Sequence, residues 1–222
     1  MSTAAAANPW FSWRYLENNW SDIVAYTGQH VSLTVQAMLI ALVVALPLGL
    51  LARTRPAFAG AILGTSAVLY TIPSLALFGL LVPFTGIGRT TVLIGLVAYA
   101  MLVLVRNILV GLQGVPGEVL DAARGMGYSP RRQLMTVELP LALPAIITGV
   151  RLATVTTVAL VTVGVVVGYG GLGQLMFRGF TSNYRAEILT ATVLCLIIAL
   201  AADVLLIAVG RMLTPWVRRR VS

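Results

Sequence analysis

The sequence predicts an all-α polytopic membrane protein with about five transmembrane helices, and three observations carry that prediction. Of the 222 residues 59% are hydrophobic, and only 10% are charged, which is well below the charged share of soluble domains. Apolar stretches of the roughly 20 residues that a helix needs to cross a bilayer also recur along the chain. They lie at about residues 30–52, 58–83, 90–111, 141–167 and 187–213. With this composition we expect no second, soluble domain.

The arginine residues predict how these stretches are oriented, because short cytoplasmic loops retain basic residues and an odd number of spans separates the two termini. One set of connections holds only Arg14, Arg89, Arg178 and Arg185. The other holds Arg53, Arg55, the arginines between Arg106 and Arg132, Arg211 and the run from Arg218 to Arg220. We therefore expect the amino terminus outside and the carboxyl terminus inside a bacterial cytoplasmic membrane. The net charge of +8 then reflects membrane topology and not binding to nucleic acid.

The chain is expected to divide into three parts. Residues 1–29 place aromatic side chains among polar ones, as an extracytoplasmic amphipathic segment at the membrane interface does; they are Trp10, Trp13, Tyr15, Trp20 and Tyr26. Residues 30–213 form the transmembrane domain, and 214–222 form a cytoplasmic arginine-rich tail. His30, the single histidine, lies at the outer border of the first span, which favours an interfacial position over a metal site.

A polar segment interrupts the apolar chain at residues 118–139. Proline is tolerated in a first helical turn and glycine allows a left-handed exit, so the sequence predicts a short helix that begins near Pro116 or Gly117 and stops around Gly125 to Gly127. Ser129 can cap a second helix, with the following proline in its first position. We expect this second helix to end before Pro140, because the residue that precedes a proline disfavours helical geometry.

The first of these short helices suits docking to another protein. Ala122 and Ala123 carry little side chain, so a second surface can approach the backbone closely. Val119, Leu120 and Met126 offer apolar contacts beside them. The alternative is a merely solvated loop, but such a loop would not need caps, paired prolines and apolar residues at helical spacing.

The stretch "DAARGMGYSPRRQLMTVELP", from Asp121 to Pro140, resembles the EAA loop found in the membrane subunits of ATP-binding-cassette importers. Asp121 stands where the family has glutamate, and Val137 stands where it has isoleucine. The resemblance implies that residues of about 112–140 form a coupling loop seated in a cleft of a separate cytoplasmic ATPase. The coupling residues that it implies are Asp121, Ala122, Ala123, Gly127, Leu139 and Pro140.

Other stretches extend the resemblance to permeases that import compatible solutes such as glycine betaine, choline, carnitine or proline. They are "YTIPSLALFGLLVPFTGIG", "ELPLALPAIITGVRLAT" and "GYGGLGQLMFRG". The resemblance covers about residues 28–213 and implies an importer permease fold of the methionine and betaine transporter type. It also implies three partners, namely a dimer of cytoplasmic ABC ATPases, a second permease that is a homologous chain or a second copy, and an external substrate-binding protein.

The chain itself is expected to be non-catalytic. It contains no lysine and therefore no phosphate-binding Gly-Lys loop, so ATP and Mg belong to the partner ATPase. We expect no cofactor or metal on this chain. The alternatives are an importer permease for another small solute such as an amino acid, an ATP-independent carrier or channel, and a membrane enzyme, for which the sequence offers no convincing set of catalytic residues.

Two further groups of residues are candidates for the transport path. Proline and glycine interrupt regular helices in membranes, and the residues that could form a gate are Pro73, Gly168, Gly170, Gly171 and Gly173. Aromatic faces attract quaternary ammonium groups without a hydrogen bond, and the candidate substrate contacts are Tyr70, Phe78, Tyr99 and Tyr169. Helix packing and membrane anchoring are the alternative roles for both groups.

Arg151 and Asp203 are charged residues within predicted spans, where charge is costly unless it is paired or hydrated. At about 1.5 Å per residue from the inner ends of their helices, the two lie at comparable depth. We therefore predict a structural ion pair between the fourth and fifth spans, the alternative being two separately hydrated charges.

Overall fold

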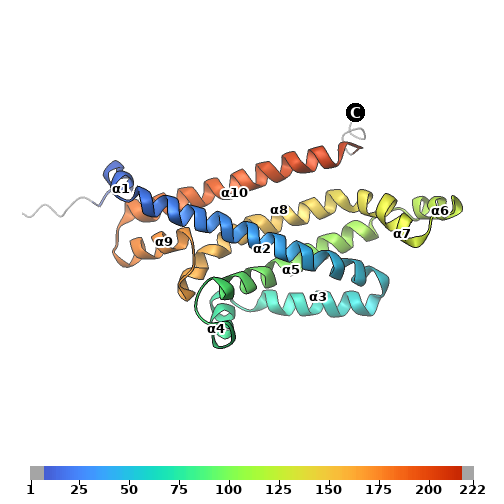
Figure 1. Cartoon of the computed structure of the whole chain (residues 1–222), viewed down its shortest axis with the longest axis horizontal. Coiled ribbons are helices and arrows are strands. Elements are labelled where there is room, and N and C mark those ends of the chain that lie inside the picture. The colour runs from blue at the N-terminus through green and yellow to red at the C-terminus, as the bar shows by residue number, and fades with distance from the viewer. Residues whose placement is uncertain (1–7, 217–222) are drawn as a thin grey trace, which may run out of the picture. The chain divides into compact units, whose positions relative to one another are not determined.

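The computed structural model describes residues 8–216, and every regular element in that range is helical. Four helical stretches are long and apolar enough to cross a membrane: α2 (Trp20–Thr54), α5 (Arg89–Gln113), the continuous stretch 130–167, and α10 (Arg185–Leu213). A fifth candidate is the pair α3 (Pro56–Thr71) and α4 (Ser74–Thr85). Figure 1 shows these helices in chain order. The prediction of an all-α membrane protein with about five spans is confirmed.

The chain divides into two compact units, and α2, α5, α8 (Leu139–Val163) and α10 contribute residues to both. Unit 2 comprises 38–71, 97–155 and the chain from 202 onward. Its core lies where α2, α5 and α8 pack together, with Ala41 and Ala45 of α2 fully buried near Leu104 of α5. Gly111 of α5 lies so close to α8 that an added Cβ would be 2.8 Å from the Ala142 carbonyl oxygen. Small residues at such contacts let membrane helices approach closely.

Unit 1 comprises the chain up to residue 37, 72–96 and 156–201. It contains the short helices α1 (Trp13–Asn18) and α9 (Leu172–Thr181). Leu172 and Leu175 of α9 are fully buried in a cluster with Tyr15 and Ile23. The Tyr15 ring meets the Tyr184 ring edge-on, with centroids 5.4 Å apart, so aromatic packing joins the start of the chain to the segment between α9 and α10.

The second predicted span, 58–83, is not one continuous helix. The chain leaves helical geometry at Ile72 and Pro73, and α4 starts at Ser74 with Pro73 as its cap residue. A proline has no backbone N–H to donate, and it pushes the preceding residue out of the α region. Hydropathy alone could not reveal this break because both halves are apolar.

The helix that contains the first predicted span begins before residue 30. Helix α2 starts at Trp20 and runs without interruption through residue 30. Asp22 stands in its first turn, where an acidic side chain complements the positive end of the helix dipole. The assignment of 1–29 to the membrane interface stays a prediction, and the arginine run 218–220 lies outside the described residues.

The second helix of the polar segment does not end before Pro140, so that prediction is wrong. Helix α7 (Pro130–Gln133) passes directly into a π-helix, η1 (Leu134–Glu138), and then into α8. The Leu139 N–H donates to the Leu134 carbonyl, which closes an i to i+5 turn. Pro140 therefore lies in the first turn of α8. A proline ring clashes with the carbonyl four residues back in a regular α-helix, and the wider π turn relieves that clash.

Candidate functional site

Helices α6 (Gly117–Gly125) and α7 follow α5 and precede α8 in the chain, and they form a two-helix projection (Figure 1). Both α6 and α7 belong to unit 2. Gly127, at φ +77°, makes the turn between the two helices. Its N–H donates to the Arg124 carbonyl at 2.9 Å, and the Tyr128 N–H donates to the Ala123 carbonyl at 3.1 Å. These two bonds with a left-handed glycine form a Schellman motif, which satisfies the last carbonyls of α6.

The second helix of the projection starts as the sequence predicts. The Ser129 hydroxyl accepts a hydrogen bond from the Arg132 N–H at 3.4 Å, and Pro130 stands at the first helical position. The Arg132 guanidinium lies over the Tyr128 ring, 4.3 Å from its centroid. The turn is therefore supported by side chains that follow Gly127, namely Tyr128, Ser129 and Arg132.

The projection presents an apolar surface to its surroundings. Met126 is 66% exposed, and Val119 and Ala122 are also exposed, whereas Ala123 is buried within unit 2. Asp121 lies on the outside and pairs with Arg124 at 3.0 Å. The two alanines of the motif thus have different positions, since one faces outward and the other packs inward. Leu139 and Pro140 are half-buried at the start of α8.

Sequence reasoning missed a residue at the base of this projection, Glu138, which is 1% exposed. Its Oε1 accepts from Gln133 Nε2 at 3.0 Å and from Arg53 Nη2 at 2.5 Å. Arg53 lies in the last turn of α2. The available signal was a single carboxylate between two apolar residues, Val137 and Leu139, because a charge in such surroundings needs a partner.

Arg151 of α8 and Asp203 of α10 lie opposite each other in unit 2. Arg151 Nε donates to Asp203 Oδ1 at 2.8 Å, and Nη2 donates to Oδ2 at 3.1 Å. Two parallel hydrogen bonds of this kind fix the orientation of the guanidinium and also stabilise its positive charge. The predicted pair is thus present between these two helices, and its purely structural role stays a prediction.

Three of the candidate gate glycines, Gly168, Gly170 and Gly171, lie in the tight turn before α9, and Gly173 lies in the first turn of α9. Gly168 and Gly171 have φ of +75° and +54°. A Cβ on Gly170 would overlap the backbone of Val165, and one on Gly173 would overlap the backbone of Thr162. These glycines permit close packing in the present conformation, and whether they and Pro73 form a gate stays a prediction.

The four candidate substrate contacts do not form one cage within a unit. Tyr70 and Tyr99 meet edge-on in unit 2 with centroids 5.7 Å apart. Phe78 belongs to unit 1, is fully buried, and packs so tightly on Gly95 that a Cβ there would overlap the ring. Tyr169 is half-buried, in the turn after α8. Their contact with a substrate stays a prediction.

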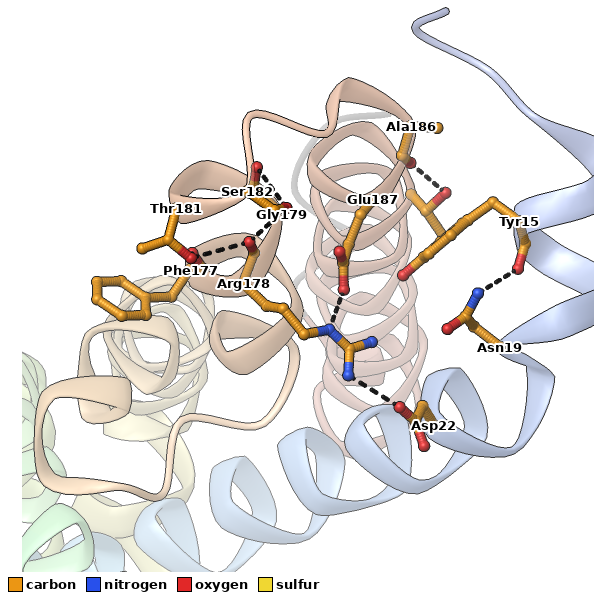
Figure 2. A network of polar contacts seen from close by, with 11 residues as sticks. Tyr15, Asn19, Asp22, Phe177, Arg178, Gly179, Thr181, Ser182, Ala186 and Glu187 are labelled. Atoms are coloured by element: carbon orange, nitrogen blue, oxygen red, sulfur yellow. Dashed lines mark hydrogen bonds and ion pairs between the residues drawn. The ribbon is translucent and has the colours of Figure 1, made fainter. Parts of the chain in front are cut away.

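A second charge network, in unit 1, joins the ends of three helices (Figure 2). Arg178, in the last turn of α9, donates to Glu187 Oε1 at 2.5 Å and to Asp22 Oδ2 at 3.0 Å. Glu187 and Asp22 stand in the first turns of α10 and α2. The acids thus lie at helix amino termini and the arginine at a carboxyl terminus, as the helix dipoles favour. Sequence reasoning had placed Arg178 only in an outer connection.

Two pKa values in this network are shifted. Burial, reinforced by the charge of Glu187, raises the pKa of the Tyr15 hydroxyl to about 12. For Arg178, burial disfavours the charged form, but the hydrogen bonds to Glu187 and Asp22 outweigh it and raise the pKa of the guanidinium. Arg178 therefore stays charged and Tyr15 stays neutral over the physiological pH range.

His30 lies within α2 and is fully buried in unit 1. Its Nε2 lies 3.0 Å from the Val158 carbonyl oxygen, and a Cβ on Gly171 would be 2.8 Å from its Cα. Its position at the membrane interface stays a prediction.

The chain is similar to known proteins. The family model of the binding-protein-dependent transport system inner membrane component matches residues 37–219. The chain is 32% identical to the choline transport system permease protein OpuBB of Bacillus subtilis over 202 residues, which are 91% of this chain and 93% of that protein. It is 33% identical to the carnitine transport permease protein OpuCB of Listeria monocytogenes, with 90% and 92% covered. It is 35% identical to the osmoprotectant import permease protein OsmW of Salmonella typhimurium, with 90% and 96% covered.

The fold also has a solved counterpart. An inward-facing structure of the MetNI methionine ABC transporter matches with a TM-score of 0.80 at 26% identity, over 89% of this chain and 99% of the matched chain. The fold class predicted from the sequence, an importer permease of the methionine and betaine transporter type, is confirmed. The chain belongs to the family of binding-protein-dependent inner-membrane transport components, and within it to the osmoprotectant permeases of ABC importers.

Proposed function

We propose that this chain forms the translocation path of an importer for compatible solutes, namely glycine betaine, choline, carnitine or proline. The names of the relatives support this range of solutes, since they are permeases for choline, for carnitine and for osmoprotectants. The chain contains no lysine and so cannot supply the phosphate-binding lysine of an ATPase. In this proposal it is a non-catalytic subunit, and ATP and Mg bind to a separate ATPase dimer.

The observation that carries the proposal is the projection formed by α6 and α7. It is closed by Gly127, capped by Ser129, and exposes the apolar side chains Val119 and Met126 around Ala122. An ordered projection that exposes apolar side chains is more often an interaction site than a loop that is merely solvated. It is therefore the surface we assign to the ATPase.

The remaining partners and the orientation follow from the same proposal. A second permease, either a copy of this chain or a homologue, shares the route, and an external binding protein delivers the solute. The amino terminus lies outside and the carboxyl terminus inside. The arginine content supports this orientation, because the projection carries Arg124, Arg131 and Arg132 and such residues are retained on the cytoplasmic side.

The test is to purify the chain with its native partners, to reconstitute the complex in vesicles, and to measure uptake of each labelled solute with and without ATP. We expect ATP-dependent uptake of at least one of the four solutes and faster ATP hydrolysis when that solute and its binding protein are present. Uptake that persists without the ATPase would instead identify a secondary carrier and would overturn the proposal.

A second candidate function, import of an amino acid such as methionine, is favoured by one observation, the likeness to the methionine transporter. Labelled methionine therefore belongs in the same uptake experiment. Uptake of methionine with no uptake of the four compatible solutes would select this second function.

A further inference from the structure

The projection is connected to the membrane helices in two different ways. On the α5 side the chain leaves helical geometry at Gly114, Val115 and Pro116. On the α8 side it stays helical from Pro130 onward, through α7, the π turn η1 and α8. A helical connection transmits a displacement, whereas a non-helical one can absorb it. The mechanical connection therefore runs through the π turn.

The π turn is held by one side-chain hydrogen bond that depends on its geometry. Gln133 and Glu138 are five residues apart, and at about 100° per residue they would lie about 140° apart around an α-helix. The i to i+5 turn brings them to the same side, and Gln133 Nε2 donates to Glu138 Oε1 at 3.0 Å. Conversion of this turn to α-helix would separate the two side chains.

The same carboxylate ties the turn to a transmembrane helix. Arg53, in the last turn of α2, donates to Glu138 and is itself 31% exposed, whereas Glu138 is 1% exposed. Gln133, Glu138 and Arg53 all belong to unit 2, so that the end of α2, the projection and the start of α8 meet at one carboxylate. A buried carboxylate without partners is energetically costly. Separation of Glu138 from Arg53 and Gln133 is therefore strongly unfavourable.

We propose that Glu138 is a positioning residue of the transport cycle: together with Arg53 and Gln133 it holds the π turn and passes movement of the projection to α2 and α8. This inference rests on the proposed function, in which an ATPase moves the projection. It assigns a role to residues outside the motif residues discussed above. Loss of the Arg53–Glu138–Gln133 contact would leave the ATPase bound and active but would uncouple ATP hydrolysis from solute movement.

The experiment compares solute transported per ATP hydrolysed in reconstituted complexes of the wild type, Glu138→Gln, Arg53→Gln, Arg53→Lys and Gln133→Leu. We expect the ratio to fall at least tenfold in the first two variants while the amount of ATPase that co-purifies with the permease stays unchanged. Arg53→Lys keeps the positive charge and is expected to restore a substantial part of the ratio. The matched control is Arg55→Gln, because Arg55 is exposed two residues further along and its guanidinium lies over the Phe58 ring, 5.7 Å from the ring centroid.

Gln133→Leu keeps the inference testable if the buried charge variants fail to fold. It removes the hydrogen bond that depends on the π turn but leaves the Arg53–Glu138 pair in place, and we expect a severalfold lower ratio. An unchanged ratio in a folded Gln133→Leu complex, or loss of the ATPase from the variants, would overturn the inference. Absence of ATP-dependent uptake in the wild type would instead refute the proposed function, so the two failures are distinguishable.

Discussion

Each of the two compact units contains a charge network built around a single shared side chain, and these two networks are built in opposite ways. In unit 1 a single arginine, Arg178, is shared by two carboxylates, Asp22 and Glu187. In unit 2 a single carboxylate, Glu138, is shared by an arginine and an amide. The central group of the first network is the cation, and that of the second is the anion.

This difference predicts which network tolerates substitution of its central residue. Removal of Arg178 would leave two acids facing each other, one of them only 5% exposed. Neutralisation of Glu138 would leave Arg53, whose side chain is 31% exposed and can reach water. Unit 1 therefore depends on its network for stability, whereas we assign the network of unit 2 to coupling.

The largest expected effect is that of Arg178→Gln. Removing one partner of a fully buried ion pair costs about 3 to 5 kcal/mol, and we expect about 2 to 3 kcal/mol here because Arg178 is 44% exposed and only Glu187 is buried. Glu138→Gln should cost only about 1 to 2 kcal/mol, as for the loss of a hydrogen bond to a charged group. Thermal or denaturant unfolding of the purified complex measures both. Equal losses would contradict the contrast between the two networks.

The next effect is the pH dependence that Tyr15 of unit 1 contributes. The pKa of Tyr15 in the folded protein is raised from 10.0 to about 12, so the stability linked to its neutral form is fully present below pH 10 and is lost as the pH rises towards 12. A shift of this size corresponds to about 3 kcal/mol. Because the chain has no lysine, no amine side chain titrates in the same range. Melting curves of the wild type and of Tyr15→Phe between pH 9 and 12 test this; an identical alkaline loss in both would exclude Tyr15 as its source.

A smaller effect is expected at the projection of unit 2, where the backbone and not a charge fixes the structure. Gly127→Ala places a Cβ in the left-handed region at a cost of about 1 to 2 kcal/mol. Gly125→Ala, two residues earlier in α6 and with open space around it, should instead favour the helix by up to about 1 kcal/mol. The measured quantity is the amount of ATPase that co-purifies per permease. We expect it to fall severalfold for the first variant only, and a similar fall in both would mean that the turn geometry is not what the ATPase recognises.

The features that could be predicted from the sequence are those set by local chemistry or by the membrane as solvent. The spans follow from hydropathy, and the turn between α6 and α7 follows from Gly127, Ser129 and Pro130. The position of Arg151 against Asp203 could be inferred because charges within spans are so few that partners can be matched by depth.

The rest depends on tertiary contacts that no local pattern encodes. Nothing in the residues Leu134 to Glu138 distinguishes a π turn from an α-helix. The turn depends instead on Pro140, which follows it in the chain, and on Arg53, which belongs to a distant helix. The partners of Arg178 likewise come from α2 and α10. The burial of His30 likewise depends on Val158 and Gly171, which lie far along the chain and which the sequence around residue 30 does not reveal.

The smallest effect distinguishes the two ion pairs of Arg178, here called the two arms of its network: one with Asp22 and one with Glu187. Asp22 is 45% exposed, so Asp22→Asn should cost less than about 1 kcal/mol, as for other exposed ion pairs. The Debye length, over which salt screens the attraction between exposed charges, falls to about 3 Å at 1 M salt. The difference in melting temperature between the wild type and Asp22→Asn should therefore vanish at high salt. The difference caused by Arg178→Gln should persist there, because Glu187 is shielded from the solvent. If the Asp22→Asn difference also survived 1 M salt, Asp22 would act through the geometry of its hydrogen bond to Arg178, and the unit 1 network would have no arm that responds to charge screening.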